Sequence, residues 1–246
     1  MKKVVLVALM VLVLALPAMA KTDIVIPPVA QDFKDVSRDL GLAISYVPLA
    51  PAEPLGGVLP GLDAGIEFTG VKLDTNKQYW KDVEAASGGT VPSFLPIPKA
   101  HIQVGLPFIP IDLGFVYSQV PTTNIKYMGG EIKYAIIKGG VVWPALAVRG
   151  AYTKLSGIDN LDLSTKSLDL SISKGFLIFT PYAGYGRVWI DSKPSGPLVP
   201  TLSEQKLSEN KGFVGCKFSF FPLLNLVAEA DIAKVKSYSL RLNLHF

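Results

Sequence analysis

The sequence predicts an all-β protein, a transmembrane antiparallel up-and-down β-barrel of about 10–12 strands. Three observations favour this fold. The last nine residues alternate strictly between apolar and polar side chains, a series of similar segments precedes them over residues 61–246, and residues 1–20 are typical of an export signal. Hydrophobic residues make up 49% of the chain, yet no run after the export signal is long enough for a spanning helix. A closed barrel is the remaining structure that satisfies every backbone polar group in lipid.

Residues 1–20 have the three parts of a secretory signal peptide. Lys2 and Lys3 form a positive n-region, residues 4–16 form an uncharged apolar run, and Ala-Met-Ala precedes Lys21 as a small-x-small cleavage site. The apolar run is shorter than the roughly 20 residues of a spanning helix, so a membrane anchor is disfavoured. We therefore expect export through the inner membrane, with a mature chain that begins at Lys21.

The N-terminal segment 21–60 fits the barrel pattern least well. Residues 31–40 have apolar side chains at helical spacing, residues 41–49 read as a strand, and residues 48–60 are rich in Pro and Gly. Two interpretations stay open. The segment is periplasmic or lumenal, or part of it supplies two further strands.

The barrel itself is expected over residues 61–246. Apart from the aromatic and Gly-rich segment 177–191, whose faces the sequence leaves unassigned, each expected strand has one apolar face and one small or polar face, as a strand between lipid and a wet lumen requires. The segments lie at 62–69, 101–106, 111–118, 131–136, 146–152, 167–172, 177–191, 214–220, 224–232 and 238–246.

The connections between these segments predict the orientation. Outer-membrane barrels have short periplasmic turns and longer outer loops. With the C-terminus at the periplasmic side, the turns near 107–110, 138–140, 174–176 and 221–224 become periplasmic, and the longer segments 74–98, 156–164 and 192–210 become extracellular. Residues 78–86 within the first of these loops read as a short helix, so that loop is either a lid or a surface loop.

The C-terminal nonapeptide is the most specific motif. Its apolar parity comprises Tyr238, Leu240, Leu242, Leu244 and Phe246, and its polar parity comprises Ser239, Arg241, Asn243 and His245. The motif resembles the C-terminal signal that the barrel-insertion machinery reads in bacterial outer-membrane proteins. That resemblance implies two partners, the insertion machinery during assembly and the outer-membrane lipid afterwards.

Over residues 61–246 the architecture resembles the bacterial outer-membrane β-barrel proteins. Residues 105–114, 147–154 and 161–171 are similar to an uncharacterised branch of that group. The resemblance implies the fold and a location in the outer membrane of a Gram-negative bacterium. It implies no activity, because small barrels serve as pores, transporters, adhesins, enzymes and structural proteins.

The polar faces of the strands predict the content of the lumen. The charged residues expected there are Glu67, Asp112, Glu131, Lys133, Arg149, Asp169, Lys217, Glu229, Asp231 and Arg241. Their mixed signs predict ion pairs that fill a narrow interior, with Arg241 pairing with Glu229 and Asp231 across a tight hairpin at 233–236. Wide aqueous channels need about 16 strands. We therefore expect a stabilising, ion-paired lumen, and the alternative is a narrow conduit gated by 21–60.

Other function classes receive little support. The two histidines, His101 and His245, both fall on the lumen parity, and no Gly-x-Ser-x-Gly motif accompanies them. No Cys/His cluster predicts a metal, no phosphate loop predicts a nucleotide cofactor, and the single Cys216 excludes an internal disulfide. The chain has 24 basic and 20 acidic residues, and without Lys2 and Lys3 of the predicted signal peptide the net charge falls from +4 to +2, which gives no signal for nucleic acid.

We therefore expect a non-enzymatic integral outer-membrane protein, with a structural role or a narrow, porin-like transport role for small or apolar solutes. The alternatives are an outer-membrane enzyme that acts on lipid and a secreted soluble β-sandwich binding protein. The aromatic residues Trp143, Tyr152, Tyr182, Tyr185 and Trp189 are expected in the girdle at the membrane interface.

Overall fold

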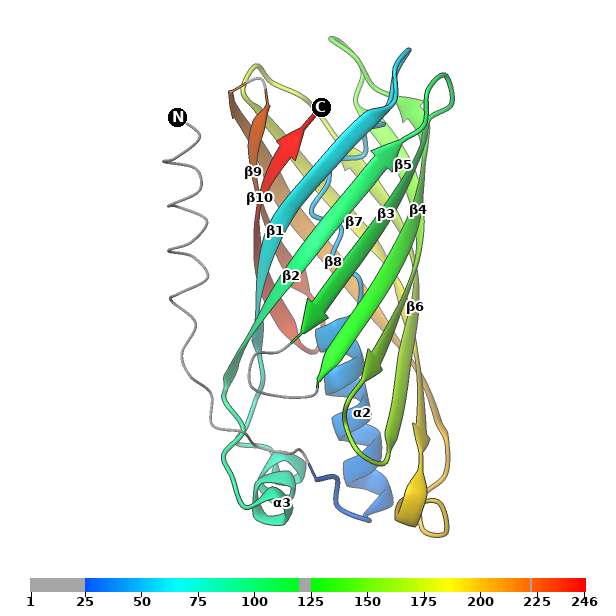
Figure 1. The fold of residues 1–246 in the computed structure, drawn as a ribbon, viewed down its shortest axis with the longest axis vertical. Coiled ribbons are helices and arrows are strands. Elements are labelled where there is room, and N and C mark those ends of the chain that lie inside the picture. The colour runs from blue at the N-terminus through cyan, green and yellow to red at the C-terminus, as the bar shows by residue number, and fades with distance from the viewer. Residues whose placement is uncertain (1–24, 120–124, 222) are drawn as a thin grey trace.

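Ten antiparallel strands form one closed barrel in which each strand pairs with its neighbours in the chain and β1 closes on β10 (Figure 1). The structure is a computed structural model that describes residues 25–119, 125–221 and 223–246. The strands are β1 (Gly61–Lys72), β2 (Phe94–Gly105), β3 (Ile111–Gln119), β4 (Lys126–Lys138), β5 (Ala145–Ser156), β6 (Leu161–Ser173), β7 (Phe179–Pro194), β8 (Gln205–Phe221), β9 (Leu224–Ile232) and β10 (Lys236–His245). The predicted all-β up-and-down barrel is confirmed, and the alternative β-sandwich is wrong because the sheet closes on itself.

The period-two pattern of the strands separates the two faces of the wall. In β10, Leu240 is 54% exposed on the outer face, whereas the next residue, Arg241, is 2% exposed on the inner face. The seam between the first and last strands extends to the final residue, because Leu62 and Phe246 exchange two backbone hydrogen bonds of 2.9 and 2.8 Å. The outer face is therefore an apolar band and the inner face is polar, as in membrane-spanning barrels.

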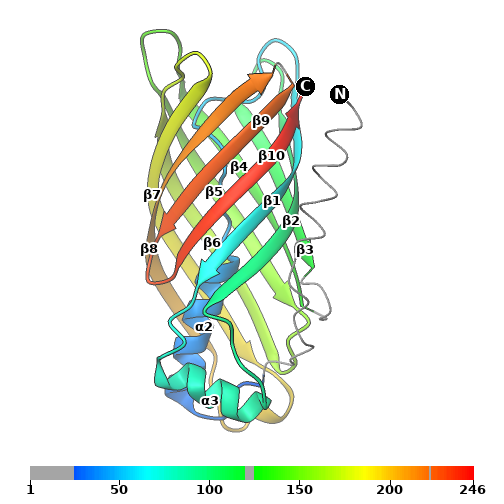
Figure 2. The ribbon, with the colours of Figure 1, turned by 90° about the vertical axis from the view of Figure 1, so that its left-hand side faces the viewer.

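The two ends of the barrel differ. The short connections at 106–110, 139–144 and 174–178 lie at the end that carries the C-terminus, which we call the turn end (Figure 1). The longest described connections, 73–93 and 195–204, lie at the opposite, loop end, together with α3 (Gln78–Ser87) (Figure 2). This end also carries the short connections 157–160 and 233–235. Gly88 ends α3 in the left-handed conformation, with φ of 65°, which glycine adopts without strain.

All three of the longer outer loops that the sequence predicts are shorter in the structure. Strand β2 already begins at Phe94, so Pro96 and Pro98 belong to the wall rather than to a loop over 74–98. Both prolines precede Ala100, where pairing with β3 begins, so their missing N–H groups cost no ladder bond on that side. The expected loop 192–210 shortens in the same way, because β7 and β8 include its two ends. The expected loop 156–164 shortens to 157–160, because β6 begins at Leu161.

The helix α2 (Ala30–Ile44) lies inside the barrel, towards the loop end (Figure 1). It packs against β5, β6, β7 and β8, and its Gly41 lies so close to Ile190 that a Cβ atom there would be 2.5 Å from that side chain. The predicted strand at 41–49 is wrong. The apolar run from 41 to 44 continues the helix because it is buried on all sides, and β1 and β10 leave no open edge for another strand to join.

Residues 45–60, which we call the plug segment, continue from α2 through the lumen to β1 at the turn end. Three wall side chains bind its backbone along the way, since Leu49, Ala52 and Leu55 donate N–H groups to Glu229, Ser173 and Asp112. The part of the predicted N-terminal segment from α2 through the plug segment thus follows the inside of the barrel, whereas residues 25–29 lie at the loop end, where the Val25 N–H donates to Ser87 of α3. None of the helices in the described part of the chain is long and apolar enough to cross a membrane. The predicted signal peptide lies outside the described residues.

Strand β7, whose faces the sequence leaves unassigned, alternates in the same way as the others. Tyr185 and Trp189 point outwards, but Tyr182 points inwards and its hydroxyl donates to Glu229 at 2.7 Å, so its predicted place in the girdle is wrong. The inward rings of Tyr182 and Phe213 each lie over a glycine of the neighbouring strand, Gly215 and Gly184. Glycine at these positions leaves the space that the rings fill.

Candidate functional site

The most distinctive chemistry of the molecule lies in the lumen, where the wall charges meet the plug segment. Of the ten expected lumen charges, eight are buried, and Asp169 and Lys217 are partly buried. The structure divides them into four clusters with distinct partners and a separate Lys217. Three of these clusters include atoms of the plug segment.

The first cluster centres on Glu67 of β1. The Lys99 ammonium lies 2.5 Å from its Oε1, and His101 Nδ1 lies 3.3 Å from its Oε2. Arg241 of β10, which faces Glu67 across the seam, contacts His101 at 2.9 Å. The hydroxyl of Tyr46, from the plug segment, lies 3.4 Å from the other ring nitrogen of His101. The group therefore joins both sides of the seam to the plug.

The second cluster consists of Glu131, Arg149 and Asp169 on three consecutive strands. Arg149 Nε lies 2.7 Å from Glu131, and its Nη1 lies 3.6 Å from Asp169. Gln103 donates a hydrogen bond of 2.9 Å to Glu131. One guanidinium thus lies between two carboxylates in the wall, as the mixed-charge pattern predicts.

The third cluster clamps the plug segment at its middle. Lys133 Nζ lies 2.8 Å from Asp112, and the same ammonium donates to the carbonyls of Pro51 and Glu53 at 2.9 and 2.8 Å. Asp112 in turn accepts the N–H of Leu55 at 3.0 Å. The Asp112–Lys133 pair therefore provides hydrogen-bond partners for buried N–H and C=O groups of the plug, which have no partners in a helix or sheet.

The fourth cluster lies between α2 and the wall. Glu229 accepts the Leu49 N–H at 2.8 Å, while Asp231 lies 3.2 Å from Lys211 of β8. Lys211 also donates to the carbonyl of Tyr46 at 2.6 Å. The expected pairing of Arg241 with these two acids is wrong, because the hairpin register sets Arg241 opposite Val227, nearer the turn end.

Lys217 belongs to none of these clusters. It lines a small cavity of about 150 Å³ towards the turn end, together with Arg241, His245 and plug residues from Ala50 to Leu55. Since the plug segment forms one side of this cavity, its volume depends on the position of the plug.

Several residues of these clusters were missed from the sequence. Lys99 and Lys211 lie on the inward parity of their strands, so the parity rule could have found them. Pro96 and Pro98 placed Lys99 next to a presumed loop, and Lys211 followed directly on a presumed loop that ended at 210. Tyr46 carried no usable signal, because its role depends on the path of the plug.

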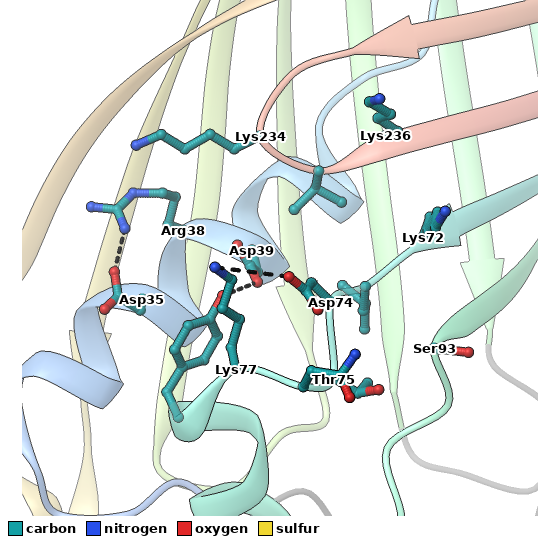
Figure 3. Close-up of a pocket in the computed structure, with 14 residues that line it drawn as sticks. Asp35, Arg38, Asp39, Lys72, Asp74, Thr75, Lys77, Ser93, Lys234 and Lys236 are labelled. Carbon is teal, nitrogen blue, oxygen red and sulfur yellow. Dashed lines mark hydrogen bonds and ion pairs between the residues drawn. The ribbon is translucent and has the colours of Figure 1, made fainter.

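A second hollow lies at the loop end, a polar cleft of about 880 Å³ between α2, α3 and the starts of the loops (Figure 3). Its deep side contains Asp39, whose Oδ2 accepts hydrogen bonds from Tyr79 and Trp80 at 2.8 and 3.0 Å. Burial raises the pKa of Asp39, and those two hydrogen bonds oppose the rise. Burial and the nearby Asp39 raise the pKa of the Tyr79 phenol. These contacts fix α3 against α2 at the mouth of the barrel.

The remaining predicted residues, those of the C-terminal motif, lie on the outer face. Tyr238, Leu240, Leu244 and Phe246 are exposed there and Leu242 is partly exposed, so the five share one face as the alternation predicts. No polar side chain interrupts this row along β10.

The chemistry available in the lumen is hydrogen bonding and ion pairing. His101 contacts the Tyr46 hydroxyl, the Glu67 carboxylate and the Arg241 guanidinium rather than a serine hydroxyl that it could activate as a nucleophile. Ser239 and Asn243, which share the polar face of β10 with His245, bond to Thr69 and Asp63. Within the described residues, no group of His, Cys, Asp and Glu side chains could hold a metal ion.

Comparison with solved structures finds bacterial outer-membrane β-barrels. The N-terminal β-barrel domain of Pseudomonas aeruginosa OprF aligns with 76% of this chain and 97% of its own, at 14% identity and a TM-score of 0.35. The translocator domain of the autotransporter NalP from Neisseria meningitidis aligns with 89% and 99%, at 7% identity and a TM-score of 0.35. Neisserial surface protein A aligns with 76% and 95%, at 9% identity and a TM-score of 0.30. No protein-family model and no curated protein matches the sequence.

Proposed function

We propose that this protein is an integral, non-enzymatic β-barrel of a bacterial outer membrane, and that it is a closed structural barrel rather than an open channel. The apolar outer face and the polar inner face support the membrane location. The signal peptide predicted at residues 1–20 supports export, and the C-terminal motif that ends at Phe246 supports assembly by the insertion machinery.

The observation that carries the closed state is the occupied lumen. Wall side chains bind the plug backbone at several positions along the barrel axis. Glu229 accepts the Leu49 N–H, and Lys133, which pairs with Asp112, donates to the Pro51 carbonyl. Each of these hydrogen bonds joins a charged group to the plug backbone, and such bonds contribute about 1.5–3 kcal/mol each. Withdrawing the plug would expose all of these groups together.

A narrow, plug-gated conduit for small or apolar solutes is the second candidate. It is favoured by the form of the plug segment, which is irregular backbone held by side chains rather than by a ladder of its own. It is also favoured by the cavity beside Lys217 and His245.

Planar-bilayer recordings distinguish the two candidates. We expect a folded barrel, identified by heat-modifiable mobility on gels, with no steady conductance. A steady conductance of the unmodified protein would overturn the closed state in favour of the conduit. A protein that remains soluble after fractionation, with no mobility shift, would overturn the membrane location itself.

The enzyme alternative has its own test. A lipid-acting enzyme would use His245 or His101 as a base, and turnover of radiolabelled phospholipid by the purified barrel would then disappear in His245→Ala or His101→Ala. We expect no turnover by the unmodified protein. Turnover that either substitution abolishes would replace the structural proposal.

A further inference from the structure

An apolar groove of about 600 Å³ runs over the outer face of β8, β9, β10 and β1. Its floor is made of the small residues Cys216, Ala228 and Ala230, and the ring of Phe94 covers Gly70. Its sides are larger side chains, namely Phe68, Phe94, Val214, Tyr238 and Leu240. Since this part of the wall belongs to the apolar band, the groove faces lipid in the proposed membrane orientation.

Two lysines stand at the end of this groove nearest the loops. Lys72 and Lys236 are exposed and directly opposite each other on β1 and β10, and Phe94 is the partner of Lys72 on the other side. The pair Gly70 and Tyr238 lies two residues further along the same faces, so the lysines are about 7 Å beyond the groove. The groove is thus apolar along its length and cationic at its end.

The lysine pair is unfavourable by itself. Like charges directly opposite each other in a sheet repel, and neither lysine has an ion-pair partner among the described residues. By contrast, the neighbouring Lys234 pairs with Glu209 at 3.0 Å. An anion between Lys72 and Lys236 would remove the repulsion and provide the missing partner.

The polar cleft at the loop end continues from the same lysines. Figure 3 shows Lys72, Lys234 and Lys236 along one side of it, and Ser93, which directly precedes Phe94, also lines it. The groove and the cleft therefore meet at Lys72 and Lys236. An apolar trough that ends in cations and opens into a polar hollow matches an acyl chain joined to a phosphorylated headgroup.

We propose that the groove and the Lys72–Lys236 pair bind one anionic lipid of the outer leaflet, with an acyl chain along the groove and a phosphate between the two ammonium groups. The inference rests on the proposed outer-membrane location, with the loop end outwards. A protein partner is disfavoured because the groove lies within the band of exposed apolar side chains, beside Val214 and Tyr238, rather than on the loops.

The headgroup half of the proposal is tested with two lipids that share their acyl chains. The folded protein in neutral detergent micelles is titrated with dimyristoyl phosphatidic acid and with dimyristoyl phosphatidylcholine, and bound lipid is counted by native mass spectrometry. A lysine near an anionic headgroup contributes about fivefold in affinity, so Lys72→Gln/Lys236→Gln should weaken phosphatidic acid binding by about 30-fold. Binding of phosphatidylcholine should not change.

Lys126→Gln/Lys154→Gln is the control with the same change of charge, although Lys154, unlike Lys72 and Lys236, pairs with Asp162 at 3.4 Å. These lysines are exposed on neighbouring strands at the loop end, but on β4 and β5, across the barrel from β1 and β10. The control should bind phosphatidic acid as the unmodified protein does. Equal losses in both double variants would mean general electrostatic attraction and would overturn the site.

The groove half is tested by filling the floor. Ala230→Phe places a ring in the groove and should lower phosphatidic acid binding at least tenfold, whereas Ala64→Phe, on the outer face of β1 nearer the turn end, should not. Glycerol phosphate, which has the phosphate without the chains, should fail to compete. Competition by glycerol phosphate, or full binding by Ala230→Phe, would overturn a lipid ligand in favour of a free anion.

The outcomes also separate this inference from the proposed function. A protein with heat-modifiable mobility that binds both lipids equally would lose the lipid site and keep the membrane barrel. A protein without the mobility shift would lose the membrane barrel, whatever lipid it binds.

Discussion

Replacing Lys133 by Met should release the plug segment while the barrel wall stays closed. The substitution keeps most of the aliphatic stem but removes the ammonium that pairs with Asp112 at 2.8 Å and holds the Pro51 and Glu53 carbonyls. Asp112 is fully buried, so it becomes an uncompensated charge in a dry site while the plug is docked. When the plug leaves, water can reach Asp112, and the penalty applies only to the docked state.

The size of the effect follows from that asymmetry. Removing one partner of a buried ion pair costs about 3–5 kcal/mol. Every 1.4 kcal/mol is a factor of about ten in an equilibrium, so the undocked population should rise roughly a hundredfold to a thousandfold. The wall is expected to remain closed, because the backbone ladder between β3 and β4 does not involve the lysine side chain.

Two measurements detect the release. In a Cys216→Ser background, an Ala50→Cys probe in the plug should react faster with a water-soluble maleimide when Lys133 is Met, because Ala50 is 4% exposed while the plug is docked. Planar-bilayer recordings should show brief openings that the parent barrel lacks. Heat-modifiable mobility should be retained in both proteins.

Lys99→Met is the matched control. Lys99 is equally buried and lies 2.5 Å from Glu67, but its ammonium contacts Glu67 and the Tyr127 ring in the wall rather than the plug backbone. It should lower barrel stability without faster labelling at Ala50. Equal labelling in the parent and the Lys133→Met protein, or the same acceleration in both variants, would refute the clamp.

Three further substitutions test other parts of the structure. Deleting Phe246 removes an aromatic side chain and two seam hydrogen bonds, whereas Phe246→Ala keeps the bonds. The amount of heat-modifiable protein in the outer membrane should fall more for the deletion than for Phe246→Ala. Equal yields would mean that the seam bonds are unimportant. Leu242→Asp puts a charge on the lipid face, at a cost below the roughly 2–4 kcal/mol of Lys or Arg, and should reduce assembly in the same assay, while Ser203→Asp in an exposed loop should not. Asp39→Leu leaves the Trp80 N–H without its acceptor and should weaken the docking of α3 by about 1–3 kcal/mol. The loss should appear as faster proteolysis over residues 73–93. Asp39→Asn keeps an acceptor and should change the proteolysis rate little.

The sequence predicts the wall better than its contents for a physical reason. The side-chain period of a strand is local, so alternate residues such as Leu240 and Arg241 can be assigned to opposite faces from spacing alone. The identity of ion-pair partners is not local. Proximity in sequence pairs Arg241 with the acids of β9. In the structure, the hairpin register places Arg241 opposite Val227 of β9, and the seam places it opposite Glu67 of β1.

The path of the plug could not be predicted because the conformation of its residues depends on tertiary contacts rather than on a periodic sequence pattern. The run from Gly41 to Ile44 is apolar whether it forms a strand or a buried helix, and only the absence of an open edge decides for the helix. Lys99 was missed for a related reason, since Pro96 and Pro98 usually mark a loop and are accommodated here only where β2 has one paired neighbour.

The charged lumen and the plug segment explain each other. Asp112 and Lys133 neutralise each other within the wall, but their remaining hydrogen-bonding capacity is directed at the plug backbone, at Pro51, Glu53 and Leu55. Without the plug, Asp112 and Lys133 would need other hydrogen-bond partners. Without these wall side chains, the buried backbone groups of the irregular plug would be unpaired. The plug continues directly into Gly61 of β1, the strand that pairs with β10 at the seam. Plug and wall therefore supply polar partners to each other within the closed barrel, and the Lys133→Met experiment tests that dependence directly.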